Sequence, residues 1–197
     1  MSLSIIIPTL NEAANLPALL AELAPLQARG AQIIVADGGS TDASRDLLPA
    51  AVEWLDAPRG RARQMNAGAA QASGSVLWFV HADTRLPAEA DQLIEAALAG
   101  GRHCWGRFDL RIDGRPWLLK VVARLISWRS RLTSIATGDQ GIFVLRSHFE
   151  TLGGYADQPL MEDIELCTRL RQLSAPACIG TRLSTSGRRW EQRGVWR

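Results

Sequence analysis

Apolar and polar positions alternate in blocks through the first half of the chain. Short apolar runs predict four buried strands, at 3–7, 32–37, 52–57 and 77–80. Apolar residues at helical spacing predict helices over about 11–29, 40–48, 59–73 and 88–98, the first capped by Asn11 and the second by Ser40 or Thr41. Strands and helices in alternation, with short connections, predict a parallel sheet with right-handed crossovers.

The regular alternation of strands and helices ends after Gly100. The elements expected there are an exposed alternating strand at 104–113, an amphipathic helix at 116–132, a glycine-flanked loop entering a strand at 137–146, and a helix at 159–173. The last helix is expected to turn Ile164, Leu166 and Leu170 inward. We therefore predict one α/β domain with a nucleotide-type half, 1–99, and a recognition half, 100–197.

The helix at 116–132 is both apolar and basic. Its apolar side comprises Trp117, Val121, Leu125 and Trp128, and its cations are Lys120, Arg124, Arg129 and Arg131. An apolar side of this kind most often packs on a sheet or on a neighbouring subunit, and we expect that here. Peripheral contact with a membrane surface is the alternative.

Composition narrows the class of protein. With 197 residues, 47% apolar and 21% charged, the chain has the make-up of one soluble globular domain. A net charge of +2 gives no support for a nucleic-acid partner. Three cysteines without C-x-x-C spacing argue against a disulfide framework and fit a reducing cytoplasm. Neither a signal peptide nor a membrane span is recognisable, so we expect a cytoplasmic protein, peripheral to a membrane at most.

Polar residues follow three of the predicted strands. The sequences "PTLNE", "ADGGSTD" and "HAD" come at the ends of the first, second and fourth strands. Ligands bind at the carboxyl ends of parallel strands, so these groups are expected around one crevice. Glu12 is suited to a ribose or base edge, and Asp37 to either a nucleoside contact or the capping of its own turn. Arg59, Arg61 and Arg63 follow the third strand, where guanidinium groups suit phosphate oxygens.

Asp83 is the strongest candidate for a metal ligand. A carboxylate at a strand tip can hold Mg²⁺ or Mn²⁺ while a diphosphate and waters complete the coordination. The alternative is a helix N-cap formed by Asp83 and Thr84. His81, two residues earlier, either touches the same ligand or is a packed neighbour.

Glu162 and Asp163 form a second acidic pair at the expected start of a helix. The helix dipole favours carboxylates at that position whatever their function. In a functional interpretation, one of them is a general base that takes the proton of an acceptor hydroxyl.

The ordered set of these motifs resembles family 2 glycosyltransferases, which have the GT-A fold. The matching stretches are "IIPTLNE", "VADGGSTDAS", "GRARQMNAGAA", "HADT", "GGYADQ", "MEDIEL" and "RRW". Some of them, together with "GDQGIF", also resemble a bacterial subgroup assigned to arsenosugar biosynthesis, also called selenodomain-associated glycosyltransferases. The fold expected from this resemblance is a Rossmann-like, mostly parallel central sheet flanked by helices.

The resemblance also implies roles for individual residues. It implies Asp163 as the base with Glu162 beside it, Asp83 as the ligand of Mg²⁺ or Mn²⁺, and inversion at the sugar carbon. Strand ends and resemblance together give the expected donor-binding residues, which are Pro8, Thr9, Glu12, Asp37, Gly39, Arg61, Asn66, His81, Arg189 and Trp190. The family's first motif carboxylate is replaced here by His81, and the chain ends soon after "RRW".

The predicted function is transfer of a sugar from a UDP- or GDP-type donor to the hydroxyl of an unidentified acceptor. A homo-oligomer is one of the assembly states that this hypothesis allows. A non-catalytic nucleotide-sugar binder is the main alternative, given His81. A sugar-phosphate nucleotidyltransferase is a weaker one, because the first strand runs into "PTLNE" and not into a glycine-rich loop.

Overall fold

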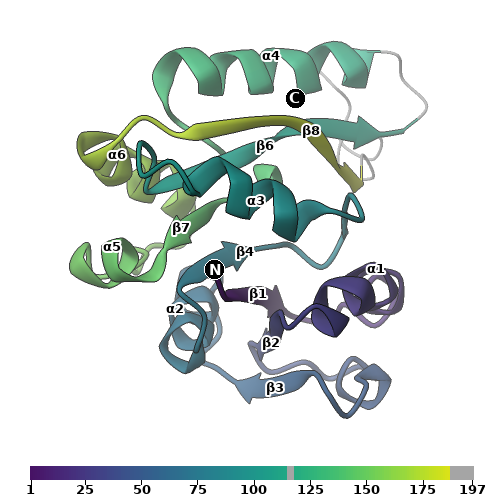
Figure 1. Ribbon diagram of the computed structural model, residues 1–197. Coiled ribbons are helices and arrows are strands. Elements are labelled where there is room, and N and C mark those ends of the chain that lie inside the picture. Colours follow the sequence, from purple (N-terminus) through teal and green to yellow (C-terminus); the bar gives the residue numbers. More distant parts are fainter. Residues whose placement is uncertain (115–117, 187–197) are drawn as a thin grey trace.

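Four strands from the first half of the chain form the parallel half of a central sheet. The computed structural model describes residues 1–114 and 118–186. Its first four strands are β1 (Leu3–Thr9), β2 (Gln32–Asp37), β3 (Glu53–Asp56) and β4 (Val76–Phe79). They lie in the order β3-β2-β1-β4, and every neighbouring pair among them is parallel (Figure 1). The four predicted strands are therefore confirmed.

The second half of the chain extends the same sheet. It adds β6 (Trp105–Asp113), β7 (Phe143–Leu145) and β8 (Ala177–Ser186). The short β5 (Thr84–Arg85) of the first half pairs with β8, so the order continues β4-β7-β6-β8-β5. β7 runs antiparallel to both of its neighbours, whereas β6 and β8 are parallel to each other. Because β7 pairs directly with β4, both halves of the chain contribute to one sheet.

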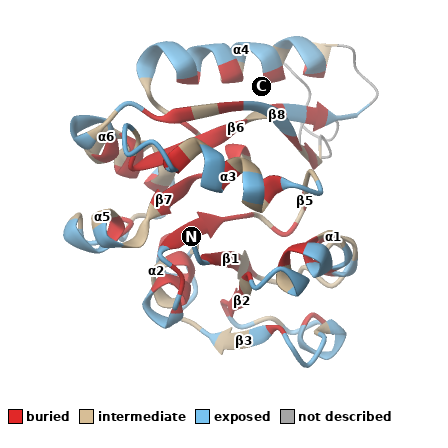
Figure 2. Cartoon of the chain, viewed as in Figure 1, coloured by how far each residue is buried: buried red, intermediate tan, exposed pale blue. Residues whose placement is uncertain are grey.

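Helices cover both faces of the sheet (Figure 1). α1 (Leu16–Ala28) and α3 (Ala90–Leu98) pack on one face. α2 (Arg61–Gln71), α5 (Arg146–Thr151) and α6 (Glu162–Leu173) pack on the other. α4 (Leu118–Thr133) lies over β6 with a small apolar cluster of its own. Figure 2 shows β1, β2 and β4 buried between these layers, whereas β3 at the edge of the sheet is partly exposed.

The helix predicted for 40–48 is wrong. The described chain has only a short 3₁₀ turn there, Arg45–Leu47. Ser44 donates its hydroxyl to Asp42 and accepts a hydrogen bond from the Glu12 amide at 3.0 Å. Ser and Asp side chains that bond the backbone in this way compete with helix formation.

The predicted cap on Asn11 is also wrong, because α1 begins five residues later at Leu16. Asn11 has a left-handed backbone, with φ at 55°. Its side-chain oxygen accepts the Thr41 amide at 2.8 Å, so Asn11 joins the loops after β1 and β2.

The strand at 104–113 was expected to be exposed, and most of it is buried. β6 is flanked by β7 on one side and β8 on the other, so its edges are covered. Even Arg107 is fully buried, paired with Asp109 and donating to the Ser127 carbonyl at 3.0 Å. Alternation alone did not reveal that Arg107 has internal partners.

The amphipathic helix packs with the side opposite to the one predicted. The residues of α4 that face β6 are Leu119, Ala123, Ser127 and Ser130, and three of these are small. Small side chains let the helix approach the strand closely, and the Ser127 hydroxyl accepts the Leu110 amide at 3.0 Å. Val121, Leu125 and Trp128 are exposed, so this apolar side does not cover the sheet. Trp117 lies outside the described residues.

The helix predicted at 159–173 is confirmed over Glu162–Leu173. Leu166 and Leu170 face the core as expected, while Ile164 is only half-buried. Across the described part of the chain, no helix combines the length and the apolar character that a bilayer crossing requires.

Burial on α6 has a measurable consequence for Cys167. Its thiol is buried and lies 3.6 Å from the Ala136 carbonyl, and burial raises the pKa of this thiol to about 12. Only the thiolate reacts, so alkylation by iodoacetamide at neutral pH should be about 1,000-fold slower than for a free thiol. Mass spectrometry of native and urea-unfolded protein should show Cys167 modified only after unfolding, and rapid native labelling would contradict this packing.

Candidate active site

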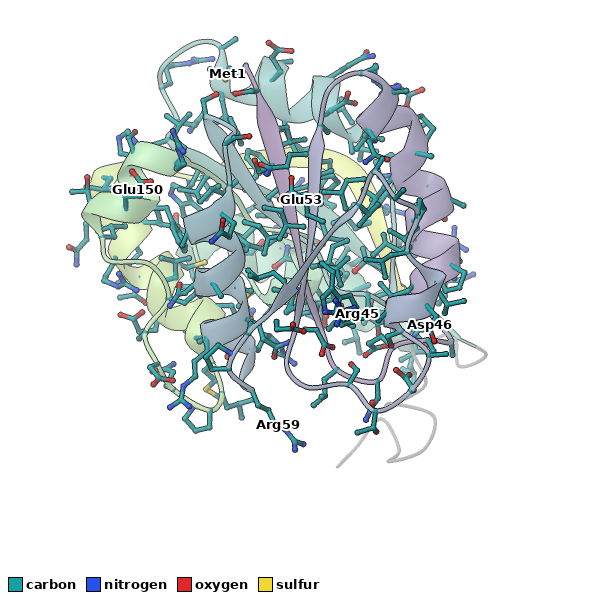
Figure 3. The ribbon with its side chains drawn as sticks, turned by 90° about the horizontal axis from the view of Figure 1, so that it is seen from below. Met1, Arg45, Asp46, Glu53, Arg59 and Glu150 are labelled. Carbon is teal, nitrogen blue, oxygen red and sulfur yellow. The ribbon has the colours of Figure 1, made fainter. Side chains whose placement is uncertain are left out.

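A cleft of about 360 Å³ opens at the carboxyl ends of β1 and β4. Of the residues predicted from sequence, it is lined by Pro8, Thr9, Glu12, Arg59, Arg61, His81 and Asp83. Figure 3 shows Arg59, at the start of α2, reaching outward at the end of the molecule opposite Met1, where β1 begins. The polar groups that follow the first and fourth strands are therefore brought together, as their positions predicted.

Glu12 is held in place by the first turn of the chain after β1. Its carboxylate accepts a hydrogen bond from the Asn15 side chain at 2.5 Å. Its backbone carbonyl accepts the amides of Asn15 and Leu16, which begin α1. The carboxylate thus has a fixed position at the cleft wall.

Asp83 lines the cleft, and its carboxylate has no hydrogen-bond partner among the described residues. Within residues 1–114 and 118–186, no side chain or amide hydrogen-bonds this carboxylate. It is not a helix N-cap, because α3 begins only at Ala90. The alternative interpretation of Asp83 is therefore wrong, and the group is available to a ligand.

The donor set fits a metal ion that is bound together with a diphosphate. No three His, Cys, Asp or Glu side chains of the described residues come together as a metal site. Asp83 would supply one hard oxygen ligand to such an ion, and a diphosphate and waters would supply the others. Glu12, His81 and Asp139 line the same cleft.

His81 is oriented by a carboxylate that sequence reasoning missed. Its Nδ1 lies 3.0 Å from an Asp139 oxygen, which fixes the plane of the ring. Asp139 belongs to the short turn Gly138–Gln140 in the "GDQG" motif. Glycines on both sides of two polar residues were the signal that could have marked this turn as functional.

Asp163 is not one of the residues that line this cleft, but the same turn connects it to Asp139, which is. One of its oxygens accepts the Gly138 amide at 2.6 Å, and the other accepts the Ile164 amide at 2.7 Å. A Cβ atom on Gly138 would lie 2.7 Å from the His81 ring and 3.6 Å from the Asp163 carboxylate. His81 and Asp163 therefore flank one glycine, and only a residue without a side chain fits between them.

Glu162 is buried behind the cleft wall. It is 2% exposed and pairs with Arg61, its oxygen 3.2 Å from the guanidinium. This ion pair connects α6 to α2 and leaves Arg61 partly exposed at the cleft. Glu162 thus lies where it can hold Arg61 in position, whereas the neighbouring Asp163 is partly exposed.

Several predicted residues lie outside the cleft lining. Arg63 is turned away, bound to Asp157 by two hydrogen bonds of 2.8 Å that lower the pKa of that carboxyl. Asn66 makes a reciprocal pair with the backbone of Tyr155, at 2.8 and 2.9 Å, and so connects α2 to the loop before α6. Arg189 and Trp190 lie outside the described residues.

Asp37 and Gly39 form part of the turn after β2, and they hydrogen-bond to each other there. The Asp37 carboxylate is 3% exposed and accepts the amides of Gly39 and Ser40 at 2.9 and 2.8 Å, together with the Ser40 hydroxyl. Turn capping therefore accounts for Asp37 in this structure. Gln64, which was not predicted, connects this region to β1, donating to the carbonyls of Thr9 and Ala36 at 2.6 and 2.9 Å.

Replacing Asp37 should measure this structural role. We expect Asp37→Ala to lower the free energy of unfolding by about 2 kcal/mol, because buried donors lose a charged acceptor. Urea denaturation followed by circular dichroism gives the value, with the exposed Asp46→Ala as a control expected to change it by less than about 0.5 kcal/mol. Unchanged stability with lost nucleotide binding would assign Asp37 to the nucleoside.

Comparison with known proteins identifies the family. Residues 4–149 match the model of glycosyl transferase family 2. The chain belongs to this family. A PGL/p-HBAD biosynthesis glycosyltransferase of Mycobacterium tuberculosis is 41% identical over 165 residues, covering 77% of this chain and 62% of the relative. The succinoglycan biosynthesis protein ExoA of Rhizobium meliloti is 33% identical over 108 residues, covering 49% of this chain and 33% of that protein.

Solved structures confirm the GT-A-like fold predicted from the sequence. TarS of S. aureus in complex with UDP superposes with a TM-score of 0.74 at 16% identity, covering 94% of this chain and 60% of that one. Glucosyl-3-phosphoglycerate synthase of Mycobacterium tuberculosis, with Mn²⁺, UDP and phosphoglyceric acid, gives 0.67 at 21%, covering 93% and 69%. This family 2 chain spans about 62% of the length of the mycobacterial curated relatives.

Proposed function

We propose that the chain is a glycosyltransferase that moves a sugar from a nucleoside-diphosphate sugar to an acceptor hydroxyl. The observation that carries this proposal is the free Asp83 carboxylate in a cleft that Asp139 also lines, next to Gly138, which donates its amide to Asp163. Family membership supports it, as do the fold relatives solved with UDP or with GDP-mannose and Mn²⁺.

In this proposal, the donor lies along the carboxyl ends of β1 and β4. Glu12 contacts the nucleoside, and Arg61 contacts a phosphate oxygen while Glu162 holds its guanidinium in place. A divalent ion at Asp83, Mg²⁺ or Mn²⁺, would neutralise charge that develops on the leaving diphosphate. His81, oriented by Asp139, faces the same region of the donor.

The chemical step assigned to the protein is the removal of a proton. Asp163 accepts the proton of the acceptor hydroxyl as that oxygen forms a bond to the anomeric carbon of the sugar. The bond between this carbon and the diphosphate oxygen breaks, and the nucleoside diphosphate leaves with its electron pair. A single displacement of this kind inverts the configuration at the sugar carbon.

The finer predictions remain hypotheses. The curated relatives are named for other biosynthetic products, so assignment to the arsenosugar subgroup is not supported by them. The division into a donor half, 1–99, and an acceptor half, 100–197, also stays a prediction.

Slow hydrolysis of the donor tests the proposal without knowledge of the acceptor. UDP-glucose, UDP-N-acetylglucosamine and GDP-mannose are incubated with Mn²⁺, and the nucleoside diphosphate released is measured. We expect release from one of them, lost on chelation and in Asp83→Ala. Metal-dependent binding of a donor without any turnover would favour the non-catalytic binder, and neither binding nor turnover would contradict the proposal.

A further inference from the structure

α4 presents an apolar surface that no described residue covers. Its exposed members, here called the apolar ridge, are Val121, Leu125, Trp128 and Leu132, with exposed fractions of 39%, 57%, 63% and 68%. They recur at helical spacing on the side of α4 opposite to the small residues that pack on β6. In Figure 1 α4 forms the outermost layer of the fold, and in Figure 2 its outward side is exposed along most of the helix.

A cationic groove runs along the flank of this ridge. It has a volume of about 320 Å³ between α4, β6 and β8, and its cations are Lys120, Arg124, Arg111 and Arg182. Arg111 pairs with Asp113 at 2.8 Å. No other described residue forms an ion pair or side-chain hydrogen bond with Lys120, Arg124 or Arg182. Three cations without partners beside an apolar surface therefore lack an anionic counterpart within the described chain.

Two further features of α4 indicate what kind of molecule covers the apolar ridge. The spacing of the ridge, four, three and four residues, is also that of a helix–helix seam. However, residues 118–133 contain four cations and no Asp or Glu. A second copy of α4 against the ridge would bring like charges together along the seam, which is unfavourable. The occupant that suits both features is apolar in its interior and anionic at its surface.

We propose that the ridge and the groove together bind the surface of an anionic lipid bilayer. Leu125, Trp128 and Leu132 enter the boundary between headgroups and acyl chains, as apolar faces of interfacial helices do. Trp128 is suited to that depth because its ring is apolar and its N–H can reach water or a headgroup. Lys120, Arg124 and Arg182 contact headgroup phosphates from the groove. This docking surface is separate from the cleft and does not depend on its proposed chemistry.

Flotation of the full chain with vesicles tests the proposal. Vesicles of phosphatidylcholine alone are compared with vesicles that contain about 30 mol% phosphatidylglycerol, at about 0.05 M and 0.5 M NaCl. We expect binding to the anionic vesicles at low salt, and weak binding at high salt or without anionic lipid. Lys120→Gln/Arg124→Gln/Arg182→Gln should reduce the partition coefficient about 100-fold, since each cation near an anionic surface contributes roughly fivefold.

Substitution in the ridge tests its apolar part separately. Leu125→Gln/Trp128→Gln should reduce binding by at least about tenfold, because two apolar side chains no longer enter the lipid. The control Leu47→Gln/Leu173→Gln changes exposed leucines elsewhere and should bind like the parent chain. Thermal unfolding of each variant verifies that the fold is retained.

Three results would overturn the proposal. One is the absence of binding to anionic vesicles, and another is equal binding to neutral vesicles at both salt concentrations. The third is a dimer in light scattering that Leu125→Gln/Trp128→Gln converts to a monomer, because a second copy would then occupy the ridge.

Discussion

Asp163→Asn is expected to lower the rate of sugar transfer about 1,000-fold while leaving donor binding within about threefold. The amide keeps the shape of the side chain but cannot accept the acceptor's proton as the oxygen attacks. Rates are measured as release of nucleoside diphosphate with the acceptor once identified, and before that as donor hydrolysis. Donor affinity is measured by calorimetry.

Asp157→Asn is the matched control for this substitution. Asp157 is an exposed carboxylate that pairs with Arg63 away from the cleft, so its variant should keep the parent rate within about twofold. A transfer rate in Asp163→Asn within about tenfold of the parent would remove Asp163 from the role of base.

Gly106→Ala should cause a large loss of stability, about 3–4 kcal/mol in the free energy of unfolding. Gly106 lies in the buried part of β6, between β7 and β8. A Cβ atom there would lie 2.4 Å from the Ala177 carbonyl oxygen and 2.4 Å from the edge of the Phe143 ring. The backbone of β8 cannot move away without breaking its ladder with β6. Urea denaturation measures the loss of stability. If the variant is too unstable to purify, poor recovery of soluble protein is the expected result.

Gly180→Ala provides the comparison within the same sheet. Gly180 lies in β8, and a Cβ atom there would have no neighbour within 4 Å. Its variant should be as stable as the parent or slightly more stable, since alanine restricts the unfolded chain. Similar stabilities of Gly106→Ala and Gly180→Ala would contradict the packing described for β6.

The first half of the fold could be predicted from the sequence because three of its strands, β1, β2 and β4, are buried on both faces. A strand such as β2 is a continuous apolar run that ends in Asp37, so both its extent and the location of its polar end were readable. The same reasoning placed Glu12, His81 and Asp83 at one cleft. Parallel strands end at a common edge, which makes strand-end residues neighbours wherever they lie in the chain.

What could not be predicted depends on partners distant in sequence. Arg107 in β6 looked solvent-exposed, yet in the interior it pairs with Asp109 and donates to the Ser127 carbonyl. The inward side of α4 was misjudged because Ser127 and Ser130 are polar residues that hydrogen-bond within the contact. Asp139 was missed because its significance comes from His81, 58 residues earlier.

Calorimetric titration of the full chain with UDP and GDP, with and without Mn²⁺, tests the central claim most directly. The account predicts that one nucleotide binds in the presence of Mn²⁺. We expect this binding to weaken at least about tenfold without the metal or in Asp83→Ala, and to persist in Asp157→Ala. Failure of both nucleotides to bind, or binding unaffected by Mn²⁺ and by Asp83→Ala, would contradict the assignment of this cleft to a metal-bound nucleoside diphosphate.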